Sequence, residues 1–370
     1  MDNFRTDGFR LGFGLMRLPT LADGSIDVDQ TAAMADAFLE AGGTYFDTAF
    51  VYPGSELAIR KALFDRHPRE SFTIATKLNA RVAKDAADAR QQFFTSLERL
   101  NKDYVDYYLL HAISKNNAKL YEDYGIWDFV KEQKAAGKIR HIGFSFHDYP
   151  DLLEKLLTEH PEAEFVQLQM NYADWESPGV RSRANYETVR KFGKLVTVME
   201  PVKGGTLADP PRSVRALLDA ADPKASYASW AIRYIASLDG ILTVLSGMSN
   251  LAQMKDNLSY MKDFRPLNES EQGVIRAAQE AMAAVETIPC TACGYCVEGC
   301  PMSINIPGIF RARNQQLVFE NDGQAKREYG FATRGKGKAS DCVHCLQCED
   351  ACPQKLPITE LLESCAELLE

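Results

Sequence analysis

The chain has 370 residues, a formal net charge of −9 and 45% hydrophobic residues. This length exceeds that of most single domains, so we expect one large domain and one smaller one. The acidic balance argues against nucleic-acid binding, and no stretch is long and apolar enough to span a bilayer. The first residues lack the apolar core of a signal peptide, so we expect a cytoplasmic protein without membrane contact.

Roughly the first 260 residues alternate between short apolar runs and segments with helical spacing. We predict eight strands at Leu11–Met16, Thr44–Thr48, Phe72–Thr76, Val105–Leu110, Ile139–Phe144, Phe165–Met170, Leu195–Met199 and Ile241–Leu245. We predict helices between them at Ala33–Ala41, Ala86–Leu100, Ile126–Ala136, Val180–Phe192 and Tyr227–Leu238.

This alternation predicts a parallel sheet that is covered on both faces. Eight strand–helix repeats fit a (β/α)8 TIM barrel, an α/β fold of about this size. The alternative is an open, doubly wound sheet, which usually shows a Gly-x-Gly-x-x-Gly turn after an early strand. Only the partial match Gly12-Phe13-Gly14 is present, and it falls within the first predicted strand.

The alternation of strand-like and helical segments ends after the eighth predicted strand. We expect the barrel to occupy residues 1–262, a connecting loop and alanine-rich helix to occupy 263–286, and a small, mainly helical domain to occupy 287–370. Helices are expected there at Ile309–Gln316 and Ala325–Tyr329.

All nine cysteines lie in the last part of the chain. Two runs, each Cys-x-x-Cys-x-x-Cys-x-x-x-Cys-Pro, begin at Cys290 and Cys342. This is the bacterial ferredoxin run, in which three cysteines bind one [4Fe–4S] cluster and the fourth binds the other. One set would be Cys290, Cys293, Cys296 and Cys352, and the other Cys342, Cys345, Cys348 and Cys300.

Zinc is the alternative for these cysteines. Structural zinc usually takes two separated Cys-x-x-Cys pairs, whereas each run here has three cysteines in close series. Thiolate ligands require a reducing compartment, in agreement with the cytoplasm. Cys365 lies outside both runs and is interpreted as a buried apolar residue of the final helix.

In a TIM barrel the catalytic groups stand at the C-terminal ends of the strands. Asp47 ends the second predicted strand and Tyr52 follows it, while Lys77 and His111 follow the third and fourth. These four side chains are therefore expected to meet at one rim.

In type, order and strand position, these four residues resemble the catalytic tetrad of the aldo-keto reductases. The resemblance covers roughly residues 9–260, and the branch it indicates carries a C-terminal module with two [4Fe–4S] clusters. It implies carbonyl or alcohol chemistry at the rim.

The chemistry also follows from the residue types. A tyrosine with an ordinary pKa near 10 is a weak acid at neutral pH, and a nearby ammonium favours its phenolate. We therefore expect Lys77 to lower the pKa of Tyr52, and Asp47 to keep Lys77 charged and in place. His111 could hydrogen-bond and orient the substrate oxygen.

The resemblance also implies a nicotinamide site. Ser145 and Gln167 match two contacts to the carboxamide, but Phe146 stands where the family has asparagine. Met199 stands where an aromatic residue usually stacks on the ring, and methionine can also pack against a flat ring.

For the adenosine half of the cofactor, the resemblance implies the segment after the eighth strand. The matching residues are Gly247, Ser249, Asn250, Gln253 and Asn257. Gly247 and Gln253 replace the basic residues that usually hold a 2′-phosphate, which leaves NADH, NADPH and neither open.

Three functions are compatible with the sequence. The first is an oxidoreductase in which NAD(P)H supplies hydride to a small-molecule substrate and the clusters exchange electrons with a ferredoxin or flavodoxin. The second is a nicotinamide-independent reductase fed through the clusters, with or without a flavin. The third is a non-enzymatic electron-transfer subunit.

Overall fold

The computed structural model describes residues 8–370. Eight parallel strands close into a barrel in sequence order, from β1 next to β2 through to β8 next to β1. The strands are β1 (Leu11–Gly14), β2 (Tyr45–Asp47), β3 (Thr73–Leu78), β4 (Val105–Ile113), β5 (Ile139–Phe146), β6 (Phe165–Gln169), β7 (Leu195–Met199) and β8 (Ile241–Ser246). The closed barrel confirms the predicted TIM barrel and excludes the open sheet.

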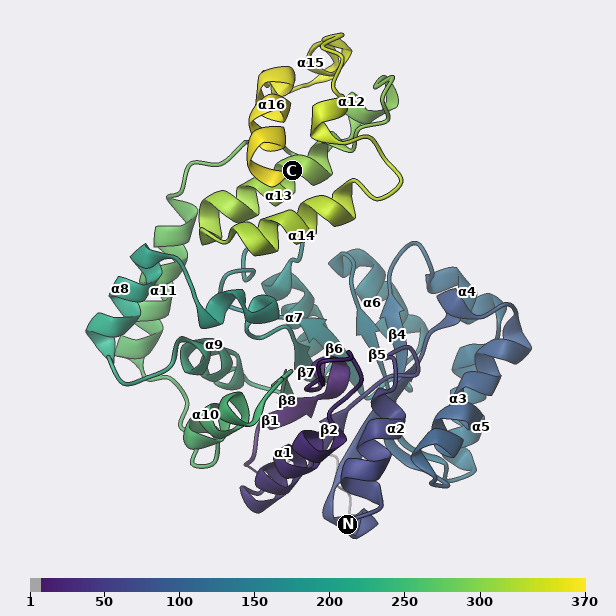
Figure 1. The fold of residues 1–370 in the computed structure, drawn as a ribbon. Coiled ribbons are helices and arrows are strands. Elements are labelled where there is room, and N and C mark those ends of the chain that lie inside the picture. The colour runs from purple at the N-terminus through teal and green to yellow at the C-terminus, as the bar shows by residue number, and fades with distance from the viewer. Residues whose placement is uncertain (1–7) are drawn as a thin grey trace. The chain divides into compact units, whose positions relative to one another are not determined.

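Helices surround this barrel (Figure 1). They are α1 (Val28–Glu40), α2 (Ser55–Ile59), α3 (Ala86–Leu100), α4 (Ala118–Asp123), α5 (Ile126–Ala135), α6 (Pro150–Glu159), α7 (Ser182–Lys191), α9 (Tyr227–Ala236) and α10 (Leu251–Met261). The helix α11 (Glu269–Ala283) begins in the barrel unit and continues into the second unit. A tight 3-10 turn at Leu15–Arg17 ends the first strand earlier than the sequence indicated. Our sequence reading also missed α6 and began α1 too late, since the Asp27 carboxylate caps that helix by accepting from the Gln30 N–H.

The barrel has two layers of core. Its interior is filled by Tyr45, Ala75, Tyr107, Leu109, Phe165, Leu242 and Leu245. A larger apolar layer lies between strands and helices. Gly143 is required in the interior, because a Cβ there would lie 2.6 Å from the Phe165 ring and 2.7 Å from its carbonyl oxygen.

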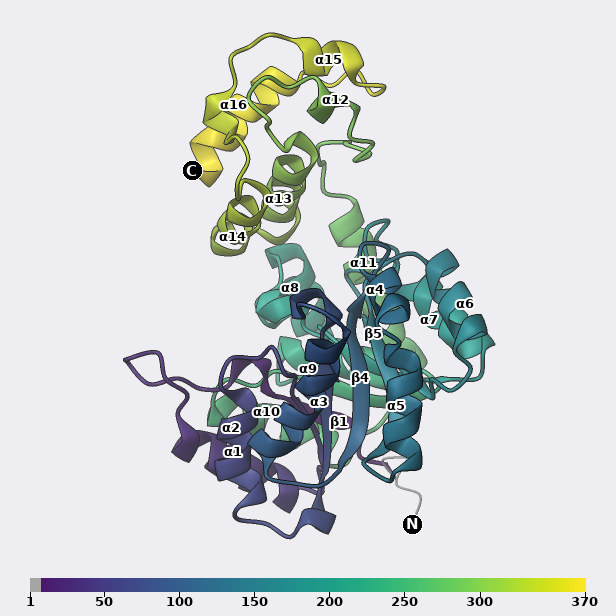
Figure 2. The same ribbon diagram turned by 90° about the vertical axis from the view of Figure 1, so that its right-hand side faces the viewer.

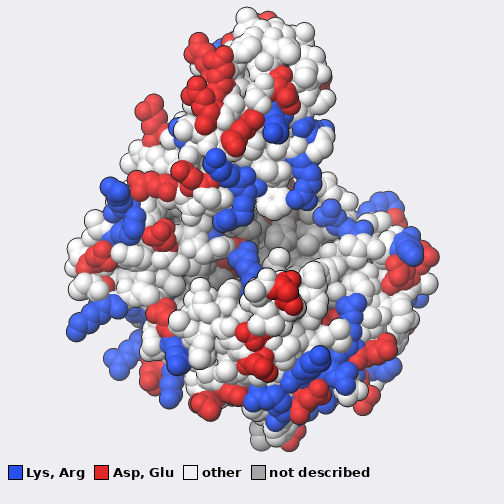
Figure 3. All heavy atoms as spheres, in the orientation of Figure 1, with Lys and Arg blue, Asp and Glu red and all other residues white. Residues whose placement is uncertain are grey.

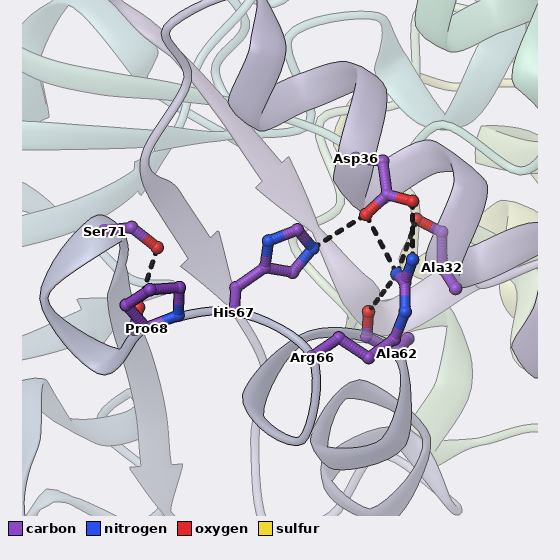
Figure 4. Close-up of polar contacts among 7 residues, drawn as sticks. All are labelled: Ala32, Asp36, Ala62, Arg66, His67, Pro68 and Ser71. Atoms are coloured by element: carbon purple, nitrogen blue, oxygen red, sulfur yellow. Dashed lines mark hydrogen bonds and ion pairs between the residues drawn. The ribbon is translucent and has the colours of Figure 1, made fainter.

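Polar contacts fasten α1 to the segment that follows α2. The Asp36 carboxylate accepts two hydrogen bonds from the Arg66 guanidinium, at 2.9 and 2.7 Å, and pairs with the His67 ring (Figure 4). The Arg66 hydrogen bond is the main reason that the pKa of Asp36 lies below its usual value. Asp47 and Tyr52 lie between α1 and α2 in the sequence, so this anchoring supports their positions.

The remaining residues form a second compact unit, Gly205–Tyr227 together with Arg276–Glu370. Its helices are α8 (Arg212–Ala221), α12 (Tyr295–Glu298), α13 (Ile306–Phe319), α14 (Asp322–Ala332), α15 (Gln347–Ala351) and α16 (Ile358–Leu369). The two helices predicted here lie within α13 and α14, whereas α8 was missed. Figures 1 and 2 both show α12 beside α15 at the tip of this unit.

This unit has its own apolar core, in which Ile309, Phe310 and Leu362 are fully or almost fully buried. Cys365 is completely buried in the same core, which confirms its interpretation as an apolar residue of the last helix. By contact, Gly205–Tyr227 joins this unit, although the sequence suggested a continuous first domain to residue 262. No helix within residues 8–370 has both the length and the apolarity to cross a membrane.

Candidate active site and cluster-binding region

The barrel brings the four predicted rim residues together. Asp47 is the last residue of β2, Lys77 lies near the end of β3, and His111 lies in β4. The Lys77 ammonium is fully buried and donates to Asp47 Oδ1 at 2.5 Å and to the Thr48 carbonyl oxygen at 2.6 Å. Asp47 is also buried, so the two charges neutralise each other inside the rim.

Tyr52 stands over this ion pair. Lys77 Nζ lies 5.1 Å from the centre of the Tyr52 ring, and the ring of His111 lies edge-on to it with centroids 5.7 Å apart. A phenol, an ammonium and an imidazole therefore face the same point. This is the meeting of side chains that the strand-end positions predicted.

The pKa values differ from the expectation in one respect. Burial raises the pKa of Tyr52 above 10, and the neighbouring Lys77 offsets this only in part. Lys77 thus lowers the pKa of Tyr52 as expected, but the pKa still lies above its ordinary value in the free protein, because desolvation of the phenolate outweighs the ammonium. Burial also works against the charge of Lys77, but Asp47 and then Tyr52 raise its pKa overall. Lys77 is accordingly protonated.

His111 is a neutral imidazole at working pH. Burial, followed by the charges of Lys77 and His147, lowers its pKa to about 3. Its Nδ1 atom is buried and has no hydrogen-bond partner within the described residues. A neutral ring that retains hydrogen-bonding capacity beside Tyr52 suits an oxygen-bearing ligand.

The residues predicted to hold a nicotinamide ring occupy neighbouring strands. Ser145 of β5 pairs in register with Gln167 of β6. Ser145 Oγ accepts from the Ala112 N–H at 2.6 Å, and Gln167 Nε2 donates to Asp47 Oδ2 at 3.3 Å. Met199, at the end of β7, is half-buried. The Phe146 side chain instead packs in the outer core, so it does not take the place of an amide facing the rim.

The polar residues of the segment after β8 form hydrogen bonds with one another and with the end of β8. Gln253 Oε1 accepts from the Ser249 N–H at 2.8 Å, and Asn250 Oδ1 accepts from the Gln253 N–H at 2.9 Å. Asn257 Nδ2 donates to Ser246 Oγ at 2.6 Å. At Gly247 there is no side chain to offer a charge. The N-terminus of α10 thus lies where the sequence placed a phosphate site, but its own side chains occupy two of its donors.

Sequence reasoning missed a second set of charges at the strand ends. Arg17 follows β1 and its Nη2 lies 3.3 Å from Oε1 of Glu200, which follows β7. Lys203 Nζ lies 2.7 Å from Asp174 Oδ1. Glu200 and Lys203 both have positive φ angles, 59° and 50°, which non-glycine residues adopt at an energetic cost. The one available signal was the position of Glu200 directly after a strand.

In the second unit, one of the two predicted cysteine sets lines a cavity. This single cavity is lined by Cys290, Cys293, Cys296 and Cys352. This is the set predicted from the sequence, with three cysteines from the first run and one from the second. The other walls of the cavity include Ile306, Phe310, Leu356 and Ile358. Four sulfur donors in an apolar wall suit a cubane cluster, whose irons each take one thiolate. Within residues 8–370, no three metal-binding side chains converge as a lone ion requires.

The backbone repeats itself around the two cysteine runs. Residues at three matched positions have positive φ angles: Ala292 and His344, Gly294 and Leu346, Ser303 and Lys355. In each run, a short helix follows the second of these positions: α12 in the first run and α15 in the second. The same strained loop built twice indicates a shared role for both runs, since such conformations persist only where the surroundings require them.

Taken together, these features define a parallel (β/α)8-barrel protein with an appended cysteine-rich helical unit. Residues 10–280 match the Aldo/keto reductase family, and residues 289–356 match the 4Fe-4S dicluster domain. Because the first match covers most of its length, the chain belongs to the aldo/keto reductase family.

Individual relatives agree with this assignment. Aldo-keto reductase str7 from Strobilurus tenacellus is 29% identical over 209 residues, which are 53% of this chain and 59% of that protein. Probable aldo-keto reductase 1 from Glycine max is 28% identical over 183 residues, 46% of this chain and 50% of that protein. The chain thus spans only about half to three fifths of these two curated relatives.

Solved structures share the barrel. Aldo-keto reductase AKR11C1 from Bacillus halodurans, in its holo form, has a TM-score of 0.60 and 25% identity, covering 73% of this chain and 91% of that one. An aldo-keto reductase from Klebsiella pneumoniae in complex with NADPH has a TM-score of 0.59 over the same shares, at 19% identity. The latter likeness concerns the fold alone.

Proposed function

We infer that this protein is an oxidoreductase that interconverts a carbonyl and an alcohol at the barrel rim, and that two [4Fe–4S] clusters exchange electrons with a partner. The observation that carries the proposal is the buried Lys77–Asp47 pair beneath Tyr52, with neutral His111 at its edge. Catalytic roles for these four residues form part of the proposal.

Each of the four residues has one task. In the direction of reduction, Tyr52 donates its hydroxyl proton to the carbonyl oxygen as the C=O π bond breaks. Protonated Lys77 stabilises the phenolate that remains, and Asp47 holds Lys77 in place. His111, being neutral, positions the same oxygen by a hydrogen bond. A nicotinamide supplies the hydride to the carbonyl carbon when it is bound, and hydride plus proton balance the reduction to an alcohol.

For that nicotinamide, Ser145, Gln167 and Met199 are the proposed contacts on the ring side. A Klebsiella pneumoniae protein of the same fold binds NADPH, so we compare NADH with NADPH as cofactors for this chain. In this chain, neither Gly247 nor Gln253 offers the positive charge that a 2′-phosphate favours. We therefore propose that NADPH has no advantage over NADH, with Ser249, Asn250 and Asn257 on the adenosine side.

The alternative is a reductase that receives electrons only through its clusters. The contact that favours it is the hydrogen bond from the Ser249 N–H to the Gln253 side chain, which occupies a donor that a cofactor phosphate would use. A flavin would then be one way to collect two single electrons for a two-electron reduction. Small-molecule chemistry at the rim is common to both versions.

The clusters are assigned to the two cysteine sets. One set is Cys290, Cys293, Cys296 and Cys352, and the other Cys342, Cys345, Cys348 and Cys300. Along the chain, we propose the domain limits 1–262, 263–286 and 287–370, while by contact Gly205–Tyr227 belongs to the second unit. We propose a reducing location such as the cytoplasm because thiolate ligands require one.

Anaerobic titration of the reconstituted protein with NADH and NADPH separates the two versions. Binding of either cofactor, followed by reduction of test carbonyls, supports the first version. Turnover with a reduced viologen, in the absence of nicotinamide binding, supports the second. Protein that contains zinc in place of about eight irons and matching sulfide would refute both.

A further inference from the structure

The second cysteine loop, Cys342–Cys348, exposes apolar side chains next to its ligands. Val343 and Leu346 are 57% and 50% exposed, and the Cys345 between them is exposed as well. Apolar side chains beside an exposed cluster ligand bring no folding benefit, and together they form a surface that a partner could cover.

The first cysteine loop supplies an internal comparison. Thr291 and Gly294 occupy the positions that correspond to Val343 and Leu346. Gly294 and Leu346 both adopt positive φ angles, 85° and 61°. Glycine accepts this conformation without cost, whereas a leucine with positive φ is strained. The second loop therefore keeps an exposed leucine at a position where the sister loop has the residue that the backbone prefers.

The ligands of the two loops are buried alike: Cys290 and Cys342 are half-buried, Cys293 and Cys345 exposed, and Cys296 and Cys348 buried. The loops differ in the side chains between these ligands. The first loop exposes one aromatic ring, that of Tyr295. Gln347 occupies the corresponding position in the second loop, so Tyr295 provides a matched control.

The segment that contains the second loop is acidic. The last 30 residues contain seven Asp or Glu and one Lys, a net charge of −6 without histidine. The loop touches the acidic helix α16 directly, since His344 Nε2 lies 3.5 Å from Glu363 Oε1. Asp341, Asp350, Glu360 and Glu363 are all exposed. On the face drawn in Figure 3, the upper tip shows acidic and uncharged atoms.

We propose that Val343 and Leu346, within this acidic segment, form the docking surface for a one-electron redox protein with a basic rim. This rests on the proposed function, in that the loop must hold a cluster. One electron passes between the partner and a [4Fe–4S] cluster: the cluster is [4Fe–4S]⁺ when it is the donor and becomes [4Fe–4S]²⁺ as the oxidised partner is reduced, and no bond or proton is transferred. An acidic carrier, whether ferredoxin or flavodoxin, would be repelled by the same surface.

The test uses the full holoprotein and a cationic c-type cytochrome as the probe, with an anionic blue-copper protein for comparison. Stopped-flow mixing of dithionite-reduced holoprotein with the oxidised cytochrome gives the second-order rate constant. We expect this constant to fall at least tenfold between 20 and 300 mM salt, and to exceed that of the anionic protein at low salt. Calorimetric titration of the two oxidised proteins measures binding without electron transfer.

The decisive variant is Val343→Thr with Leu346→Gly, which gives the second loop the residues of the first. It should keep its iron and sulfide content and its reduction by dithionite, because glycine suits the backbone there. We expect the cytochrome rate constant and the binding constant to fall at least tenfold, and Tyr295→Gln to leave both unchanged. Unaltered values in the double variant, or faster transfer to the anionic protein, would overturn the docking proposal. Loss of clusters in the parent protein would instead refute the proposed function.

Discussion

Among individual residues, Tyr52 carries the proposed chemistry because its phenol ring lies next to the buried Lys77 ammonium, with 5.1 Å between Nζ and the ring centre. Replacing Tyr52 with Phe keeps the ring and its packing but removes the proton donor. We expect turnover to fall about 10²–10⁴-fold. Steady-state assays under anaerobic conditions measure this loss, and iron content should not change. Tyr149→Phe, at an exposed tyrosine, serves as the matched control, and equal activity of both variants would exclude the tetrad mechanism.

Cofactor choice depends on two residues near the N-terminus of α10. Gly247→Lys with Gln253→Arg adds two positive charges and removes the side chain that binds the Ser249 N–H. If nicotinamide binds as proposed, we expect NADPH affinity to rise by about 10- to 100-fold relative to NADH, since even one charge-assisted contact contributes roughly 1.5–3 kcal/mol. Competitive fluorescence titration checks this ratio. An unchanged ratio of NADPH to NADH affinity would show that the 2′-phosphate does not bind beside residues 247 and 253.

The His111 ring links the rim to stability in acid. Its pKa is about 3 in the folded protein and ordinarily 6.5, so below 6.5 only the unfolded chain gains a proton there. This lowers the stability of the barrel as the pH falls from 6.5 towards 3, by at most about 1.4 kcal/mol per pH unit. We expect the unfolding temperature of the barrel to drop less between pH 7 and 5 in His111→Asn than in the wild type. Calorimetric scans of both proteins at pH 7 and pH 5 measure this difference. An equal drop in unfolding temperature in the two proteins would contradict the prediction.

Among the elements, α16 begins with a cap that comes from another helix. Pro357 precedes this helix and provides no side-chain cap, and Glu349 of α15 accepts from the Thr359 N–H and hydroxyl at 2.8 and 2.6 Å. We expect Glu349→Ala to destabilise the second unit by about 0.5–2 kcal/mol, the usual value of a helix cap.

A double-mutant cycle isolates this contact. The cost of Glu349→Ala should shrink when Thr359→Val is already present, because that variant removes the shared hydroxyl bond. It should persist alongside Thr359→Ser, which retains the hydroxyl. Denaturant unfolding of the cysteine-rich unit supplies the free energies. Additive costs in both backgrounds would show that the carboxylate does not act through Thr359.

For the whole molecule, the two compact units have separate apolar cores. We expect the small unit to depend on the proposed clusters, because its cysteine loops contain several strained residues and short helices. We expect removal of iron with oxidant and chelator to unfold residues 287–370 while the barrel keeps its own thermal transition. Limited proteolysis with circular dichroism monitors this result. A single joint transition, lost entirely on iron removal, would mean that the barrel cannot fold without the clusters.

Much of the fold followed from local patterns. The strand–helix alternation predicted the eight strands correctly, and the strand ends predicted that Asp47, Tyr52, Lys77 and His111 meet. The helix α6 was not singled out from the sequence, although Pro150 at its start is a residue favoured in a first helical turn.

The sequence by itself determined the order of the elements, the residues at the strand ends and the spacing of the cysteines in their two runs of four. These features depend on neighbours a few positions apart. Only the tertiary structure decided that Arg17 meets Glu200, that Glu349 caps α16 and that the pKa of Tyr52 rises. Such features depend on burial and on contacts between distant segments, which exist only once the barrel has closed and the helices have packed.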